Sequence, residues 1–179
     1  MGMNPWEEAP HIWPTKASFF NFLRGNLRRA VWEKWPLKLE FKNEVCKPPP
    51  EDYTGRAKSG TYCALSGVWT GKSAAEIDHV LGHVSLQDWE DVLPFIQHLC
   101  ASKENMQYVS AEAHKIKSYA ERKGISFEEA ALLKIVIDLE KKKMLQDFIK
   151  SKGEKPERNA ELRREQALRL LKEEKENDL

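Results

Sequence analysis

Two stretches decide the fold: EIDHV at residues 76–80 and ENMQYVS at residues 104–110. Each has the composition of a short strand, and the second runs directly into a helical pattern that carries His114. Neighbouring side chains of a strand point to opposite faces, so Asp78 and His79 face different ways. Two strands and a helix in this order can bring a carboxylate and an imidazole to one cation, beside a separate histidine.

These residues resemble the HNH (His-Asn-His) endonucleases, specifically the small phage-encoded type. The likeness is carried by the Asp78-His79 pair, by Asn105 in ENMQYV and by His114 in AHKIKS, and it extends over roughly residues 16–123. It implies a ββα-metal core, also called a His-Me finger, with flanking helices. The expected fold class is therefore α+β and mostly helical.

The resemblance implies a role for each of these residues. His79 would be the general base, since a neutral imidazole can take a proton from water near neutral pH. Asp78 and His114 would hold one divalent cation, which binds the scissile phosphate and stabilises the leaving oxygen. A carboxylate, an imidazole and open water positions suit Mg²⁺ or Mn²⁺. Asn105 would either orient His79 or contribute to the metal site, and the sequence does not choose between them.

A structural zinc knuckle is expected to be lost. In many relatives of this type two Cys-x-x-Cys motifs form the knuckle, and the four corresponding positions here are Cys63, Ser66, Ser110 and Ala113. A structural zinc ion needs four thiolate or imidazole ligands, which one thiol cannot supply. We therefore predict no structural zinc, and we expect Cys63 to be a small core residue.

Charge is divided unevenly along the chain, although the formal net charge is only +1. Residues 16–47 carry eight basic and three acidic side chains, for a net charge of +5. Residues 51–112 carry four basic and nine acidic side chains, for a net charge of −5. A protein with this charge distribution that binds double-stranded DNA must make many of its contacts to the DNA phosphates outside the acidic core.

Six basic residues are candidate DNA contacts: Arg24, Arg28, Arg29, Lys34, Lys115 and Lys117. The first four lie on an amphipathic helix expected over residues 16–35, and the last two flank His114 on its own helix. The alternative is that these charges are simply solvated, which is the usual state of a charged helix face. Beside a nuclease core, phosphate contact becomes a comparable interpretation.

The chain is expected to have three parts: a basic helical arm ending in a proline-rich linker (1–50), the nuclease core (51–123) and a helical annex (124–179). Further elements are predicted from capping and breaking residues. They are a cap at Thr15 or Ser18, a short helix over 37–45, a helix over 88–100, a helix that begins after Ser126, and a last helix capped by Asn159. His98, within the 88–100 helix, and His83, in the preceding loop, are expected to be structural or surface residues.

Three scattered cysteines are too few for a disulfide framework, which favours a reducing compartment. The first residues show no cationic segment followed by an apolar run, and no apolar run approaches the length of a membrane span. We therefore expect no membrane association and a cytoplasmic location, in the host cell if the protein is phage-encoded.

The resulting hypothesis is a metal-dependent endonuclease that nicks or cuts DNA. One alternative is a homing-type enzyme whose arms give site specificity and which nicks one strand. Another is a non-catalytic DNA-binding or packaging accessory protein that retains the fold. Cleavage of both strands by the enzyme would require a homodimer or two binding events.

Overall fold

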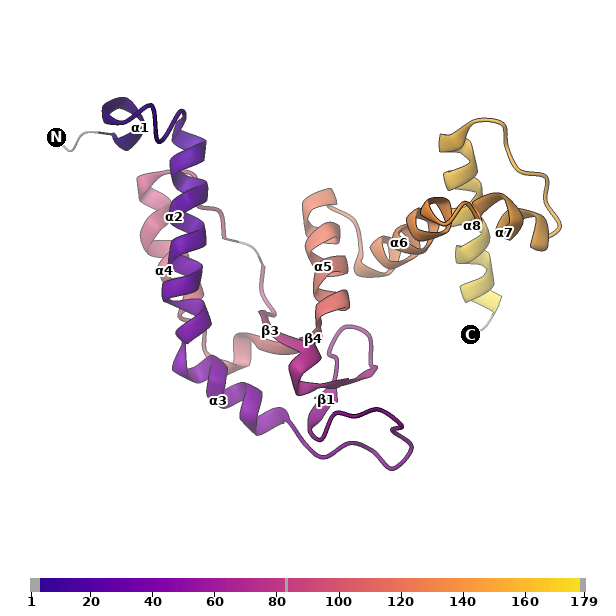
Figure 1. Cartoon of the computed structure of the whole chain (residues 1–179), viewed down its shortest axis with the longest axis horizontal. Helices are drawn as coiled ribbons and strands as arrows, with labels where there is room; N and C mark the ends of the chain where they lie inside the picture. Colours follow the sequence, from indigo (N-terminus) through magenta and orange to yellow (C-terminus); the bar gives the residue numbers. More distant parts are fainter. Residues whose placement is uncertain (1–3, 83, 178–179) are drawn as a thin grey trace. The chain divides into compact units, whose positions relative to one another are not determined.

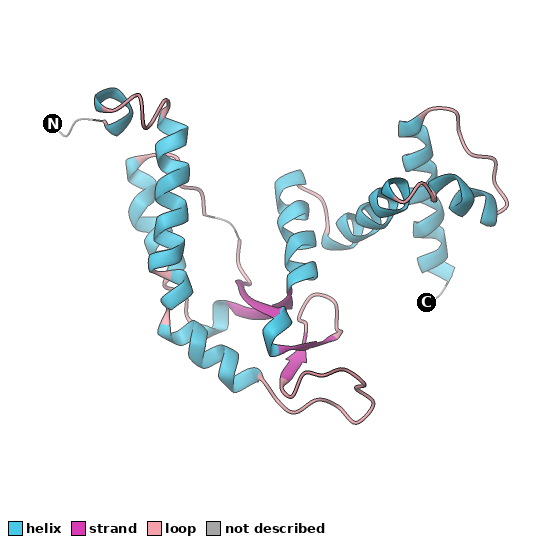
Figure 2. Cartoon of the chain, in the orientation of Figure 1, coloured by secondary structure: helices cyan, strands magenta, loops and turns pink. Residues whose placement is uncertain are grey.

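The computed structural model describes residues 4–82 and 84–177. Its elements are α1 (Pro5–Glu8), α2 (Lys16–Ala30), η1 (Trp32–Lys34), α3 (Pro36–Val45), β1 (Gly60–Tyr62), β2 (Trp69–Gly71), η2 (Lys72–Ala74), β3 (Ala75–His79), η3 (Trp89–Asp91), α4 (Val92–Leu99), η4 (Lys103–Asn105), β4 (Met106–Ser110), α5 (Ala111–Lys123), α6 (Phe127–Lys141), α7 (Leu145–Ser151) and α8 (Ala160–Asn177). Helices predominate and the strands form two small sheets (Figures 1 and 2), which confirms a mostly helical α+β fold.

The chain divides into two compact units, Met1–Ala113 and His114–Leu179. The sequence hypothesis placed boundaries after residues 50 and 123 instead. No division separates the basic arm from the core, because the two share one hydrophobic interior. The division between the two units falls inside α5, after Ala113.

The predicted strand pair is present in the first unit. β3 and β4 are antiparallel, with Ala75 opposite Ser110 and His79 opposite Met106. Ile77 on β3, and Tyr108 and Val109 on β4, are at most 4% exposed, so this sheet lies at the centre of the unit.

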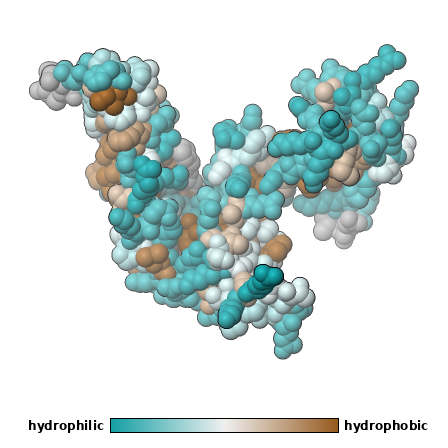
Figure 3. All heavy atoms as spheres, viewed as in Figure 1, coloured by the Kyte–Doolittle hydropathy of each residue, from teal (hydrophilic) through white to brown (hydrophobic). Residues whose placement is uncertain are grey.

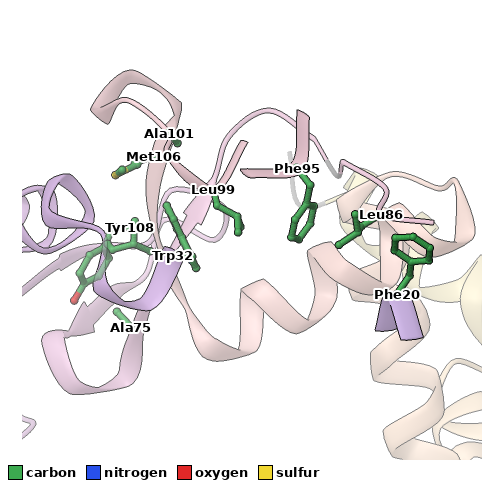
Figure 4. Close-up of a cluster of buried hydrophobic side chains, with 10 residues drawn as sticks. Phe20, Trp32, Ala75, Leu86, Phe95, Leu99, Ala101, Met106 and Tyr108 are labelled. Atoms are coloured by element: carbon green, nitrogen blue, oxygen red, sulfur yellow. The ribbon is translucent and has the colours of Figure 1, made fainter. Parts of the chain in front are cut away.

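Helices from both sides of the sequence complete the interior around this sheet. Phe20 of α2 and Trp32 of η1 belong to the same buried cluster as Phe95 and Leu99 of α4 (Figure 4). The Trp35 indole also donates a hydrogen bond to the carbonyl of Ala101, over 2.8 Å. The helix predicted over 88–100 is present and packs on the core, although its first turn, η3, is a tighter 3-10 helix.

The first long helix is shorter than the sequence indicates. Thr15 caps α2, accepting a hydrogen bond from the Ser18 amide and completing a reciprocal pair with the Ser18 hydroxyl. The α-helix ends at Ala30, and a 3-10 turn follows. Trp35 precedes Pro36 and is extended (φ −62°, ψ 119°), as the proline ring requires of its predecessor. That local constraint separates α2 from α3.

A second sheet, the β1–β2 hairpin, lies on the chain before β3 and was not predicted. Its strands have three residues each, with Gly60 opposite Gly71 and Tyr62 opposite Trp69. A Cβ atom on Gly60 would lie 2.2 Å from the carbonyl oxygen of Thr70, so only glycine permits this close pairing. The Tyr108 hydroxyl donates to the same Thr70 carbonyl over 2.9 Å, linking the hairpin to β4.

The second unit is helical and has its own core. Val136 of α6, Ile149 of α7, and Ala167 and Leu170 of α8 are buried together. Ser126 caps α6, and the Asn159 side chain accepts from the Glu161 amide at the start of α8, both as predicted. α7 was not predicted.

The surfaces of the two units differ in polarity. In Figure 3, apolar atoms gather along the segment that carries α2, whereas mostly hydrophilic atoms cover α7 and α8. Within residues 4–82 and 84–177, no helix combines the length and apolar character needed to cross a membrane.

Two leucines of α4 provide a matched test of this packing. Leu99 is completely buried and Leu93 is 64% exposed. Leu99→Ala should lower the free energy of unfolding by about 2–5 kcal/mol, because it leaves a cavity in the first unit. Leu93→Ala should change it by less than about 0.5 kcal/mol. Denaturant unfolding of the full chain measures both, and equal effects would contradict this core.

Candidate active site

His79 lies at the end of β3, with its side chain in the interior. Burial alternates along the strand, so Ile77 and His79 face the core while Asp78 faces the other way. His79 is only 5% exposed. The sequence-level expectation that Asp78 and His79 serve different faces is therefore confirmed.

The His79 imidazole is stacked between two other rings. The indole of Trp32 lies 4.1 Å away on one side and the imidazole of His98 lies 4.0 Å away on the other, measured between ring centroids. Interplanar angles of 28° and 24° make both contacts stacked. Trp32 comes from η1 and His98 from α4, so elements far apart in sequence fix the ring.

One nitrogen of His79 has a defined partner. Nε2 lies 2.9 Å from the backbone carbonyl oxygen of His98. A carbonyl oxygen only accepts, so Nε2 carries the proton in this pair.

The surroundings keep this imidazole neutral. Burial lowers the pKa of His79 to about 4, and the proximity of His98 and, more weakly, of Arg28 adds to the decrease. The hydrogen bond to the His98 carbonyl and the charge of Asp78 oppose it without cancelling it. Near pH 7 the ring is therefore a neutral base, because its pKa lies well below the working pH.

Asn105 fixes the backbone that follows His79. Its side-chain Oδ1 accepts a hydrogen bond from the amide of Leu81 over 2.7 Å, and its carbonyl accepts from the amide of Val80 over 3.1 Å. Of the two roles left open by the sequence, this geometry favours orientation of the chain around His79.

Gln107 is a residue that the sequence reasoning missed. It pairs with Asp78 across the sheet, and its Nε2 lies 3.2 Å from Asp78 Oδ2 and 3.2 Å from the carbonyl oxygen of His79. The amide therefore orients one oxygen of the carboxylate and braces the end of β3. Antiparallel pairing of the two predicted strands could have identified it, because it places Gln107 directly opposite Asp78.

The first unit thus brings together Asp78, His79 and Asn105. His114 lies on α5 in the second unit, with Lys115 and Lys117, so its pairing with Asp78 on one cation stays a prediction. Lys117 forms an ion pair with Glu121, 3.7 Å away, and Lys115 is exposed. Among the described residues, no group of three or more His, Cys, Asp or Glu side chains gathers to hold a metal. The expected site needs only two such ligands.

The candidate DNA contacts on α2 and η1 have different surroundings. Arg24 is half-buried and donates to the carbonyl oxygen of Leu86 over 3.0 Å, so it joins α2 to the segment before η3. Arg28, Arg29 and Lys34 are exposed. Arg28 is also close enough to His79 to lower its pKa. His83 lies outside the described residues.

A small hydrogen-bonded group is formed by Cys63, Ser66, Ser110 and Ala113. Cys63 is 2% exposed, and its Sγ accepts from the amide of Ser110 over 3.4 Å. The Ser110 hydroxyl in turn accepts from the amide of Ala113 over 3.1 Å. Burial raises the pKa of the Cys63 thiol, but hydrogen bonds from the Ser66 side chain and from backbone amides outweigh burial and leave that pKa below its ordinary value.

No protein-family model, no curated protein and no solved structure matches this chain. Function must therefore be argued from the residues and their geometry.

The buried imidazole predicts a pH-dependent stability. Its pKa is about 4 in the folded chain, against 6.5 ordinarily, so the unfolded chain binds the proton more tightly. Stability is fully present above the unfolded pKa and falls as the pH decreases towards the folded value. Between pH 7 and pH 5 the free energy of unfolding should fall by about 2 kcal/mol through this group.

The measurement is denaturant unfolding at several pH values in buffer with a chelator. His79→Gln should remove most of that dependence, whereas His11→Gln, at an exposed histidine, should retain it. Equal pH dependence in all three proteins would contradict the burial of a neutral His79.

The hydrogen-bonded group around Cys63 predicts that folding needs no zinc. Dialysis against a strong chelator should leave the thermal unfolding midpoint unchanged, because protein groups alone connect the knuckle positions. Elemental analysis of the purified chain is the complementary measurement. One tightly held zinc ion per chain, with a lower midpoint after its removal, would contradict this prediction.

Proposed function

We propose that this protein is a metal-dependent endonuclease of the HNH type, which hydrolyses phosphodiester bonds in DNA. The observation that carries the proposal is the state of His79. Its ring is stacked between Trp32 and His98, and its Nε2 lies 2.9 Å from the His98 carbonyl oxygen, so the orientation of the imidazole is fixed.

His79 acts as the general base of the hydrolysis. The imidazole takes a proton from water as the water oxygen forms its bond to phosphorus, and the bond from phosphorus to the leaving oxygen breaks. That oxygen receives a proton from solvent. The contact of Nε2 with the His98 carbonyl fixes the orientation of the ring, and the lowered pKa keeps the ring unprotonated beforehand.

Asn105 and Gln107 act as positioning residues. Asn105 holds the amides of Val80 and Leu81 with its backbone and side-chain oxygens, which fixes the turn of the chain after the base. Gln107 holds the Asp78 carboxylate and the His79 carbonyl. Neither residue needs to touch the substrate to affect the rate.

Asp78 and His114 would hold the divalent cation. Gln107 already orients one oxygen of the Asp78 carboxylate. Together with one imidazole nitrogen, and with water completing the coordination, this oxygen would suit Mg²⁺ or Mn²⁺. When bound, the cation supplies charge stabilisation for the phosphate and for the leaving oxygen.

Basic residues near the base support a phosphate substrate. Arg28 is exposed and acts electrostatically on His79, so a phosphate beside this imidazole would lie near a guanidinium. Arginine suits this contact because its planar group donates two parallel hydrogen bonds to phosphate oxygens. Arg29 and Lys34 extend the same exposed basic segment.

The test is conversion of supercoiled plasmid with and without Mg²⁺ or Mn²⁺. Wild type should produce nicked or linear DNA only with the metal, and His79→Ala should reduce the rate about 10²–10⁴-fold, because it removes the base. His11→Ala, at an exposed histidine, serves as the control and should cut at the wild-type rate.

Other outcomes of the same assay distinguish the remaining functional hypotheses. A product that stays nicked favours an enzyme that acts on one strand, whereas linear product indicates paired action on both strands. If wild type slows the migration of DNA in a gel but never cuts it under these conditions, the catalytic proposal fails. The protein is then a DNA-binding accessory protein that retains the fold.

A further inference from the structure

A basic pocket lies in the first unit, apart from the residues of the candidate active site. It is an open depression of about 400 Å³, and it is lined by Lys42, Ala57, Lys58, Ser59, Lys72 and Ser73. Three lysines and two serines thus contribute to its lining. Among these described lining residues none is acidic.

Backbone contacts build this pocket from three segments. A Cβ on Gly71 would lie 2.5 Å from the Ala57 side chain, so glycine at the end of β2 lets residues 57–59 approach closely. The amide of Lys72 then donates to the carbonyl of Ser59 over 2.9 Å, which holds the two segments together. α3 supplies the third wall through Lys42.

Two of the lysines are held in place by other protein groups. The Lys42 ammonium donates to the carbonyl oxygen of Ala75 over 2.8 Å, and the Lys72 ammonium donates to Asn43 Oδ1 over 2.6 Å. Each ammonium has three N–H donors, so these bonds leave further donors for a ligand. The charges are thereby fixed in position without being neutralised by these partners.

The electrostatics of the pocket favour an anion. Burial lowers the pKa of Lys42, and the nearby charges of Lys38 and Lys72 lower it further, while Cys46 and Glu76 oppose the change. Mutual repulsion of this kind is relieved when an anion binds between the cations.

The lysines of the pocket lie together although the surrounding part of the sequence is acidic. Residues 51–112 contain only four basic side chains against nine acidic ones. One of the four, Lys103, forms ion pairs with Glu40 and Glu44, at 3.2 Å and 2.6 Å. Lys58 and Lys72 line the basic pocket instead.

We propose that this basic pocket binds a phosphate group, either a phosphodiester of a DNA strand or the phosphate of a small molecule. Tetrahedral phosphate oxygens accept from ammonium and hydroxyl donors converging from several directions. Lys42 is bonded to Ala75 at the start of β3, and His79 lies at its other end, about 13 Å along the strand. The DNA alternative rests on the proposed function, since the pocket would then hold backbone beside the scissile phosphate.

The test uses the double variant Lys58→Gln/Lys72→Gln, which removes two charges but keeps side chains that form hydrogen bonds. The control is Lys142→Gln/Lys155→Gln, at two exposed lysines of the second unit. In one arm, fluorescence anisotropy measures binding of a labelled duplex with a chelator present, so that no cleavage occurs. In the other, NMR amide shifts follow a titration with inorganic phosphate.

If DNA occupies the pocket, the double variant should bind the duplex about tenfold more weakly, and the dependence of log affinity on log salt should be shallower by about 2. The control should bind like wild type. If a small molecule is the ligand, DNA binding stays unchanged, and inorganic phosphate shifts the amides of Ser59 and Lys72 in wild type but not in the double variant.

The proposal is overturned if the double variant matches the control in both arms. These measurements are separable from the test of the endonuclease. Neither arm depends on cleavage. If wild type fails to bind DNA at all, the phosphate titration still shows whether the pocket binds phosphate. Matching circular dichroism melts verify that both variants are folded.

Discussion

The antiparallel register of β3 and β4 is the constraint on which the candidate site depends. It places His79 opposite Met106 in the interior and Asp78 opposite Gln107 on the other face. A slip of one residue would exchange the two faces and put a carboxylate in the core. A buried carboxylate is far more costly than an imidazole, which can stay neutral. The chemistry of the Asp-His pair and the packing of the sheet therefore favour the same register.

Much of the local structure follows from the sequence because its causes are local. Thr15, Ser126 and Asn159 each cap a helix through their own side chains, and Pro36 begins a new helix, all within a few residues. Strand β3 is equally predictable, because its alternation of more and less buried residues is a period-2 pattern. That alternation also anticipates the separation of Asp78 from His79.

The features that the sequence did not predict depend on contacts between distant segments, which no local pattern encodes. Trp32 looks like one more apolar residue of a basic helix, and His98 like a helix-surface histidine, yet both stack on His79. The hairpin strands have three residues each, too short for a periodic signal. The basic arm belongs to the same compact unit as the strands for the same reason, since its aromatic residues complete the interior around β3 and β4.

The double stacking of His79 also has an entropic consequence. An exposed side chain keeps its rotamer freedom until a substrate orders it, and that ordering reduces the free energy available for binding and reaction. Here the ring cannot rotate without leaving two aromatic faces and one hydrogen bond, so its ordering is complete once the chain has folded. The imidazole is thus preorganised, and its direction is set by the packing of the hydrophobic core.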